Sequence, residues 1–558
     1  MKKLYAIIIL FSLWGIHVNA QSYNWITGGG SSITFMTSTD NEQVRYMCTD
    51  ANGNVYIVSN TGALNIRVDT FYRAAAYNVS IGAVHNLIVS YTCDGALRWV
   101  KLIEGWGWVT SGGIAYSNGS IYETGDIYTN GTHYKHIGDD TTITSENLRS
   151  YTARFDTTGT LEWIRFIGPD TVSTVGQTLN SGILAIDREG FIHNFALIKP
   201  GCAVTPLFTT TLPGTYDLKY DTLGTLLTVT PVAALDSIWM ITKAVYSNQS
   251  DKWYATIQPS DYWPLVHPDW NSAVCSFTSD DSLIWRDTTG INGGIVGIDY
   301  KGGNALYVCG GGQTQNPFSL GGLSVVNTIG YANAVIFKLD TNGVAQWVYN
   351  LMGNISVTSV QNIAICANQT IAAAGVFAGF AVHGSDTITC NIGQGQNALL
   401  IIVDSNGQQI KLDQFDGSGF YDQATAVASD DNGNTFIGGK VASDISATGI
   451  SPYLSNGGNS DFFVCKYGYN CSGLSGVNTI NTLPFITVYP NPATSAFTVN
   501  AGGDKIQEIK VMNISGAIIY QTKLNADHFS FRLYESGIYF AQVTTDKQTF
   551  MKKLIVCM

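Results

Sequence analysis

Alternating apolar and polar runs along this chain form the pattern of a β-hairpin again and again. In Asn333–Gly353, the run VIFKL is followed by the turn residues Asp340–Gly343 and then by the run VAQWVYNL. Asn-Gly between two β-rich runs is a strong hairpin signal, because such a turn needs backbone at positive φ. The pattern predicts two antiparallel strands joined by a tight turn.

The same hairpin returns at intervals of roughly 60 residues. A tryptophan follows the turn in most copies, and the copies are marked by Trp99, Trp163, Thr228, Trp285, Trp347 and Lys411, of which Thr228 and Lys411 belong to degenerate copies. A second hairpin recurs in phase, aligned on Tyr56, Tyr122, His193, Tyr254, Tyr307, Ala372 and Phe436. Each of seven units therefore holds four strands, here called a, b, c and d.

A period of this length with four antiparallel strands predicts a β-propeller blade. The seventh unit has a strand c at 461–468 but no strand d, while Ser22–Gly28 forms a lone strand around Trp25. We therefore expect an all-β, seven-bladed β-propeller over residues 21–472, closed by the N-terminal strand so that no sheet edge stays unpaired. The recurring tryptophans are expected to pack between blades.

The units resemble bacterial β-propeller repeats of the form D-x-x-G-N-x-Y-V-x-G, best seen in Asp431–Gly438. This resemblance covers most of the chain. It implies the fold and leaves the activity open, because one fold carries many functions.

A linker rich in Gly, Ser, Asn and Thr at 473–483 precedes a different module at 484–558, whose strand pattern predicts a small β-sandwich. This module resembles the type A C-terminal sorting domain of the type IX secretion system of Bacteroidetes. The residues that carry the resemblance are Tyr489, Pro490, Asn491, Pro492, Gly516, Gly537, Tyr539, Lys552 and Lys553. It implies partners, namely the type IX machinery and its sorting peptidase, which usually removes the domain. The alternative is an ordinary accessory sandwich.

The first twenty residues have the pattern of a signal peptide. Lys2 and Lys3 precede the apolar run Leu4–Trp14, and we expect cleavage between Ala20 and Gln21. No later apolar run reaches the length of a membrane-spanning helix, so no transmembrane segment is expected. These features predict a secreted protein or one attached to the outer-membrane surface.

The charge of the chain excludes one function class, and the positions of its cysteines indicate core residues and one possible disulfide. Charged residues make up 13% of the chain and the net charge is −12, which excludes the basic surface of a nucleic-acid-binding protein. Of the ten cysteines, Cys275 and Cys465 occupy interior-facing strand positions and are expected to be core residues. The short spacing makes Cys465–Cys471 the best single disulfide candidate, although connectivity cannot be read from sequence.

Loop lengths indicate where a ligand would bind. The a–b and c–d turns are short and the b–c loops are long, so we expect any site on the face of the b–c and d–a connections. The candidate ligand-binding residues are Tyr262, Trp263, His267 and Trp270 on one b–c loop, and Trp106 and Trp108 on a d–a connection. These rings could stack on sugars or anchor a protein; alternatively they fold inward and plug the loops.

Other motifs are interpreted as structural. His133, His136, Asp139 and Asp140 have only loose metal-ligand spacing, and Asp50–Asn54 and Asp430–Asn434 lack the full calcium-loop pattern and coincide with turns. No catalytic motif is present, so we nominate no catalytic residue, metal or cofactor.

The leading hypothesis is a non-enzymatic binding or adhesion module for a glycan or a surface protein. The alternatives are an extracellular polysaccharide-degrading propeller and a structural surface-layer component.

Overall fold

The computed structural model describes residues 21–557 except 32–41, 63–64, 74–83, 105–108, 128–134, 138–140, 144–148, 168–177, 199–202, 206–207, 211, 233–234, 236–238, 260–271, 290–292, 314–316, 356, 391–394, 458–459, 470, 472–486, 490–492, 502–504, 515 and 547–548. The described residues are all-β, with 47 strands and no α-helix. They include no helix with the length and apolar character that a membrane crossing requires. The chain divides into two compact units, Met1–Asn470 and Cys471–Met558.

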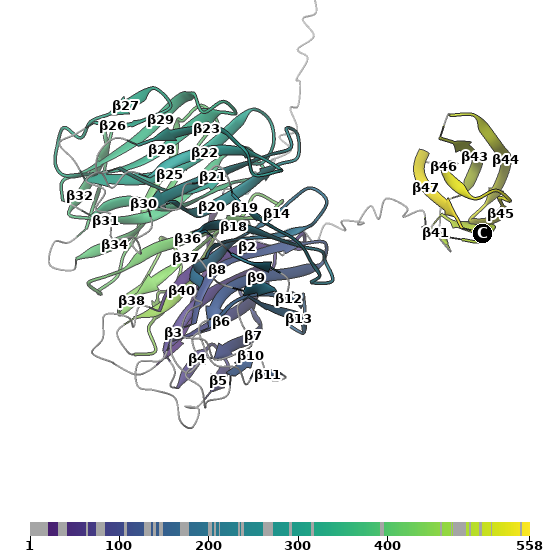
Figure 1. The fold of residues 1–558 in the computed structure, drawn as a ribbon. Helices are drawn as coiled ribbons and strands as arrows, with labels where there is room; N and C mark the ends of the chain where they lie inside the picture. The colour runs from purple at the N-terminus through teal and green to yellow at the C-terminus, as the bar shows by residue number, and fades with distance from the viewer. Residues whose placement is uncertain are drawn as a thin grey trace, which may run out of the picture. The chain divides into compact units, whose positions relative to one another are not determined.

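Six antiparallel sheets of the first unit share one plan, in which four strands pair side by side (Figure 1). The first two are β2 (Val44–Thr49), β3 (Val55–Gly62), β6 (Val84–Tyr91), β7 (Leu97–Glu104), and β8 (Val109–Ser117), β9 (Ser120–Ile127), β12 (Arg149–Asp156), β13 (Leu161–Ile167). The next two are β14 (Thr178–Ile186), β15 (Ile192–Ile198), β18 (Gly214–Tyr220), β19 (Leu226–Pro231), and β20 (Trp239–Ser247), β21 (Lys252–Pro259), β22 (Ala273–Thr278), β23 (Leu283–Thr288). The last two are β24 (Gly293–Asp299), β25 (Ala305–Gln313), β28 (Ala332–Asp340), β29 (Ala345–Gly353), and β30 (Thr358–Ile365), β31 (Ile371–Ala378), β34 (Gln396–Val403), β35 (Gln409–Phe415).

A seventh sheet combines the two ends of the first unit. Its strands are β36 (Gln423–Ser429), β37 (Thr435–Val441), β40 (Asp461–Gly468) and the N-terminal strand β1 (Ser22–Ser31). β1 pairs antiparallel with β40 from Ser22↔Gly468 to Gly29↔Phe462. The N-terminal strand thus takes the outer place that strand d takes in the other sheets.

Short hairpins extend three of these sheets or stand alone. β4 (Ile66–Val68) and β5 (Phe71–Arg73) add to β1, β10 (Lys135–Ile137) and β11 (Thr141–Ile143) add to β7, and β32 (Phe380–His383) and β33 (Asp386–Thr389) add to β29. The separate pairs are β16 (Ala203–Thr205) with β17 (Phe208–Thr209), β26 (Phe318–Leu320) with β27 (Leu323–Val325), and β38 (Asp444–Ile445) with β39 (Tyr453–Leu454).

Apolar cores lie between successive sheets. Seven clusters of buried side chains each draw on two neighbouring sheets, and the cluster between the seventh and the first includes Val464, Phe436, Val44 and Val89. The middle strands β6, β9, β31 and β40 are buried along their whole length. The innermost strands contact one another in the order β2, β8, β14, β20, β24, β30, β36, and β36 contacts β2.

The recurring tryptophans join neighbouring sheets. Their indole Nε1 donates to the carbonyl of a turn in the next sheet, at 2.8 to 3.1 Å, in the pairs Trp25–Cys93, Trp99–Thr157, Trp163–Thr222, Trp285–Thr341 and Trp347–Ser405. Each ring also lies against a glycine of that turn, such as Gly95 beside Trp25, where a Cβ atom would come within 2.6 Å. These tryptophans therefore pack and hydrogen-bond within the scaffold.

The disulfide prediction is wrong. Cys465 is a free, fully buried cysteine, whereas Cys471 is disulfide-bonded, as is Cys93. Cys465 packs in the apolar core with Ile437 and Phe463. Cys275 is likewise free and buried, as expected for a core residue.

The second unit consists of two antiparallel sheets. One contains β41 (Thr487–Tyr489), β42 (Ala496–Asn500) and β45 (His528–Arg532), and the other contains β43 (Ile506–Asn513), β44 (Ile518–Ala526), β46 (Gly537–Thr545) and β47 (Thr549–Val556). Buried side chains from both sheets share one core, among them Phe497, Phe531, Val511 and Tyr539.

Candidate functional site

A β-bulge interrupts the innermost strand of each of the seven larger sheets in the first unit. In six of these sheets, one residue of the innermost strand is skipped in the pairing with the second strand. The skipped residues are Arg45, Gly112, Thr242, Val296, Gln361 and Thr425. In the remaining sheet, the register shifts twice along β14. Bulges re-aim side chains and are frequent beside functional sites. All these bulges lie toward the starts of the innermost strands, which we call the loop end.

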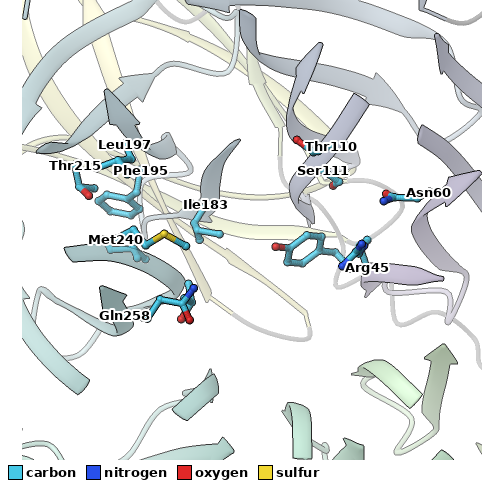
Figure 2. Close-up of a pocket in the computed structure, with 13 residues that line it drawn as sticks. Arg45, Asn60, Thr110, Ser111, Ile183, Phe195, Leu197, Thr215, Met240 and Gln258 are labelled. Atoms are coloured by element: carbon cyan, nitrogen blue, oxygen red, sulfur yellow. The ribbon is translucent and has the colours of Figure 1, made fainter. Parts of the chain in front are cut away.

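Five of the bulged residues line one pocket at the loop end, the mouth pocket. Its volume is about 400 Å³, and its lining includes Arg45, Thr242, Val296, Gln361 and Thr425 together with Gln43, Tyr46, Lys243, Asn362 and Gln423. A side pocket of about 320 Å³ shares Arg45, Tyr46 and Thr242 with it. Figure 2 shows Arg45 across the side pocket from Met240 and Gln258. At the other end of the innermost strands, a chamber of about 440 Å³ is lined by residues of all seven.

Arg45 is an exposed cation within this pocket. Among the described residues it has no acidic partner at salt-bridge distance. With the Gln43 amide oriented so that its oxygen faces the guanidinium, that oxygen accepts hydrogen bonds of 2.6 to 3.1 Å from Arg45. The amide orients the guanidinium without cancelling its charge.

Two lysines near the pocket have acidic neighbours. Lys243 Nζ donates to Asn362 Oδ1 at 2.7 Å, and burial lowers the pKa of Lys243 while the nearby charge of Asp299 raises it. Burial and the charge of Arg45 lower the pKa of Lys440, while Asp422 raises it. Lys440 is paired across the sheet with Gln423, a lining residue of the mouth pocket. The pocket is therefore electropositive, with Arg45 the least compensated charge.

Two exposed aromatic residues precede the mouth-pocket residue Gln423 in the chain. Phe420 and Tyr421 are 60% and 58% exposed. Gln396 N donates to Phe420 O at 3.0 Å, and Lys440 Nζ lies 5.8 Å from the Tyr421 ring centre. Exposed rings can stack on a flat apolar face such as that of a sugar.

Buried polar groups continue behind the side pocket. Glu123 on β9 is fully buried, which raises its pKa well above the ordinary value, and it accepts a hydrogen bond of 2.9 Å from the Tyr151 hydroxyl. Its Oε2 and the Oδ1 atoms of Asn60 and Asn86 have no hydrogen-bond partner in the described part of the chain. Asn60 lines the side pocket, so this polar interior adjoins it.

The lining of the two loop-end pockets is largely polar. Amides, hydroxyls, three valines and the cations Arg45 and Lys243 line the mouth pocket, and no carboxylate is among the described residues that line either loop-end pocket. No group of three or more His, Cys, Asp or Glu side chains in the described residues is arranged to hold a metal ion. Such a lining can donate and accept hydrogen bonds and can pair with an anion.

The aromatic residues expected to bind a ligand lie outside the described residues. They are Tyr262, Trp263, His267, Trp270, Trp106 and Trp108, and they stay predictions. His133, Asp139 and Asp140 also lie outside, and His136 is described only as part of β10. Ala20 is outside as well, whereas Gln21 Nε2 donates to Gly433 O at 3.0 Å.

The calcium-like segments are turns. Asp50 Oδ1 accepts hydrogen bonds from the backbone N–H groups of Asn52 and Asn54, both at 2.9 Å. Asp430 Oδ1 does the same for Asn432 and Asn434, at 2.9 and 2.8 Å. These carboxylate oxygens are satisfied by the turn itself.

The sorting-motif residues take structural places in the second unit. Gly516 has φ +83° in the turn after Asn513, and Tyr539 is buried with its hydroxyl donating to Glu535 O at 2.9 Å. Gly537 begins β46, while Lys552 and Lys553 on β47 pair with Ala541 and Phe540. Tyr489 ends β41, and Pro490, Asn491 and Pro492 lie outside the described residues.

Sequence reasoning did not find Arg45, Lys243, Phe420 or Tyr421. A signal existed for the first two, because polar residues recur near the start of strand a in several units. The bulges hide it, because an extra residue breaks the alternation by which inward-facing positions are read.

Comparison with known proteins identifies the C-terminal segment. Residues 487–557 match the secretion system C-terminal sorting domain, which confirms the type IX sorting domain expected from the sequence. This domain makes the chain a secreted or cell-surface protein that interacts with the secretion machinery. A curated relative, the ulvan lyase NLR42 of Nonlabens ulvanivorans, is 29% identical over 75 residues. That match spans only 13% of this chain and 14% of the lyase.

Solved structures give distant likenesses. PorZ of Porphyromonas gingivalis, a surface component of its type IX secretion system, matches at a TM-score of 0.26 and 9% identity over 92% of this chain and 81% of PorZ. A protein of unknown function from Dyadobacter fermentans matches at a TM-score of 0.36 and 8% identity, over 80% of this chain and 99% of that protein. A Trypanosoma rangeli sialidase matches at a TM-score of 0.32 and 6% identity, over 96% of this chain and 88% of the sialidase. At these TM-scores the likenesses carry no argument, and membership of a propeller repeat family stays a prediction.

Proposed function

We propose that the seven sheets of the first unit are the blades of a closed β-propeller, with β1 completing the last blade. The support is the succession of contacts from β2 to β36 and back to β2, and the chamber lined by all seven innermost strands. We propose the limits 1–20 for a signal peptide, 21–472 for the propeller, 473–483 for a linker and 484–558 for the sorting domain.

The function that the site supports best is non-enzymatic binding of a glycan at the mouth pocket of a secreted or surface-attached protein. The observation that carries this proposal is the set of bulges that aims Arg45, Thr242, Gln361 and Thr425 into one pocket. Amide and hydroxyl groups suit the many hydroxyls of a sugar, and the exposed residues Phe420 and Tyr421 closely precede the lining residue Gln423 in the chain. Hydrolysis would require an acid and a base at the pocket, and the described lining has no carboxylate.

A glycan array with the purified mature chain tests this proposal. We expect binding that falls at least about 5-fold in the Tyr421→Ala variant, because loss of ring stacking costs about 1 kcal/mol or more. Tyr469→Ala is the matched control, since Tyr469 is exposed, follows β40 and lies beside the turn residue Gly433 at the opposite end of the strands. Binding to no glycan on the array would overturn the proposal.

The tryptophans of the fourth b–c loop can be tested in the same assay. If Trp263 and Trp270 contact the ligand, Trp263→Ala and Trp270→Ala weaken binding without lowering the unfolding midpoint. If they plug the loop, the midpoint falls and binding to the mouth pocket persists.

A further inference from the structure

Within the described part of the chain, one cation of the mouth pocket has no acidic neighbour at salt-bridge distance. Lys243 donates a hydrogen bond to Asn362 and lies near Asp299. Lys440 lies near Asp422. Arg45 has no ion pair among the described residues, and its hydrogen-bond partner there is the neutral Gln43 amide. An uncompensated guanidinium in a concave pocket is a binding group for an anion.

The arginine is also held in position. Arg45 is the bulged residue of β2, between Val44 and Tyr46, which pair with Ser59 and Val58. The flanking residues fix the backbone, and the Gln43 amide limits the orientation of the guanidinium. A planar, oriented guanidinium matches the paired oxygens of a carboxylate or a sulfate.

Because the net charge of the chain is −12, we expect an anion to be attracted only at a local positive site such as the mouth pocket. A chain of that charge repels polyanions over most of its surface, so nonspecific electrostatic binding is disfavoured. An anionic ligand would therefore bind where a positive group is concentrated, and in the described residues the mouth pocket brings Arg45, Lys243 and the neighbouring Lys440 together.

We propose that the mouth pocket binds an acidic sugar, with the carboxylate or sulfate of one residue paired with Arg45 and the adjoining sugar rings on Tyr421 and Phe420. This inference rests on the proposed glycan-binding function. The pocket volume of about 400 Å³ is within the range of small-ligand sites and suits one or two sugar residues.

Titration calorimetry on the full mature chain tests the inference with three probes. They are oligogalacturonate, its neutral methyl ester, and a sulfated galactan oligosaccharide. We expect the ester to bind at least about 10-fold more weakly than the acid, and Arg45→Gln to weaken binding of the charged probes by about 10- to 100-fold, because a charge-assisted hydrogen bond is lost. Arg45→Lys should keep part of the affinity, since the charge remains and the fork geometry is lost.

Arg188→Gln is the matched control, because Arg188 is an exposed arginine in a turn at the opposite end of the strands, paired with Glu189. It should leave every affinity unchanged. Binding of one charged probe alone would support the inference and identify the anionic group. Equal affinity for acid and ester, unchanged in Arg45→Gln, would overturn it while leaving glycan binding intact. Absence of binding to all three probes and to a glycan array would overturn the proposed function as well.

Discussion

Two buried carboxyl groups meet where the N-terminal strand joins the seventh sheet, and they make stability depend on pH. A Cβ atom on Gly30 would lie 2.0 Å from Glu42 Oε2 and 2.4 Å from Asp461 Oδ1, so both oxygens face the space that this glycine leaves. Asp461 Oδ1 has no hydrogen-bond partner in the described residues. A proton on Glu42 would remove the repulsion between the two carboxylates.

Burial and the neighbouring Asp461 raise the pKa of Glu42 to about 8, and burial raises that of Asp461 to about 6. Because the folded chain holds the Glu42 proton more tightly than the unfolded chain, the stabilisation is complete below about pH 4.5 and is lost as pH rises toward 8. Each pH unit in this window is worth about 1.4 kcal/mol, so the total loss is on the order of 5 kcal/mol.

Glu42→Gln replaces the acid by a neutral amide of nearly the same shape, which removes the repulsion with Asp461. The variant keeps an acceptor for Gly62 N, which lies 2.6 Å from Glu42 Oε1, and loses the acceptor for Ser31 N. We expect it to be about 1 kcal/mol less stable than the parent at pH 5 and more stable by roughly 2 to 3 kcal/mol at pH 8.5. The two stability curves should therefore cross.

Guanidinium chloride unfolding followed by tryptophan fluorescence, repeated from pH 5 to pH 9, measures both curves. Glu189→Gln is the control, because Glu189 is exposed in a turn and should not change the slope. Parallel curves for the parent and Glu42→Gln over this range would refute the reasoning.

Three further predictions concern the scaffold and use the same unfolding assay. Trp285→Phe removes the indole donor to Thr341 O and should cost about 1 to 3 kcal/mol. Gly343 has φ +85°, and an added Cβ would lie about 3.0 Å from the Trp285 ring, so Gly343→Ala should cost about 1 to 2 kcal/mol of stability. In the double variant, the losses of Trp285→Phe and Gly343→Ala should not add, because the Trp285 ring contacts Gly343. His193→Gln should destabilise by on the order of 3 kcal/mol at pH 6 and much less at pH 10, because Asp217 and its neighbours raise the pKa of His193 to about 9 and the stabilisation disappears as pH rises through that value. An equal loss at both pH values would contradict this account.

The repeat could be predicted because its signals are local. Each short turn uses residues such as Asp340 and Gly343 within one hairpin, so turn type and strand order can be read from a few neighbouring positions. The recurrence of Trp285 and Trp347 in one place likewise indicated a shared packing role, and both indoles donate to a turn of the next sheet.

The candidate site could not be predicted because its signals are not local. Arg45 faces the pocket through a bulge, which sequence alternation does not reveal. Glu42 and Asp461 lie at opposite ends of the first unit and meet only because β1 pairs with β40. The candidate bridge Cys465–Cys471 failed because spacing along the chain does not show which sulfur atoms meet, whereas Cys465 lies buried in the core as its interior-facing position predicted.

The bulges allow the pocket to vary independently of the scaffold. The residues just before the bulged positions, namely Val44, Ile241, Ile295, Val360 and Ala424, are all apolar and buried. The bulged residues Arg45, Thr242, Val296, Gln361 and Thr425 differ in charge, size and polarity. A bulged residue makes no ladder contact with the second strand, so changing its side chain need not disturb sheet pairing or the cores. Selection on ligand chemistry can therefore act on the bulged positions while selection on stability acts on their neighbours, and Arg45→Gln should change binding without changing the unfolding midpoint.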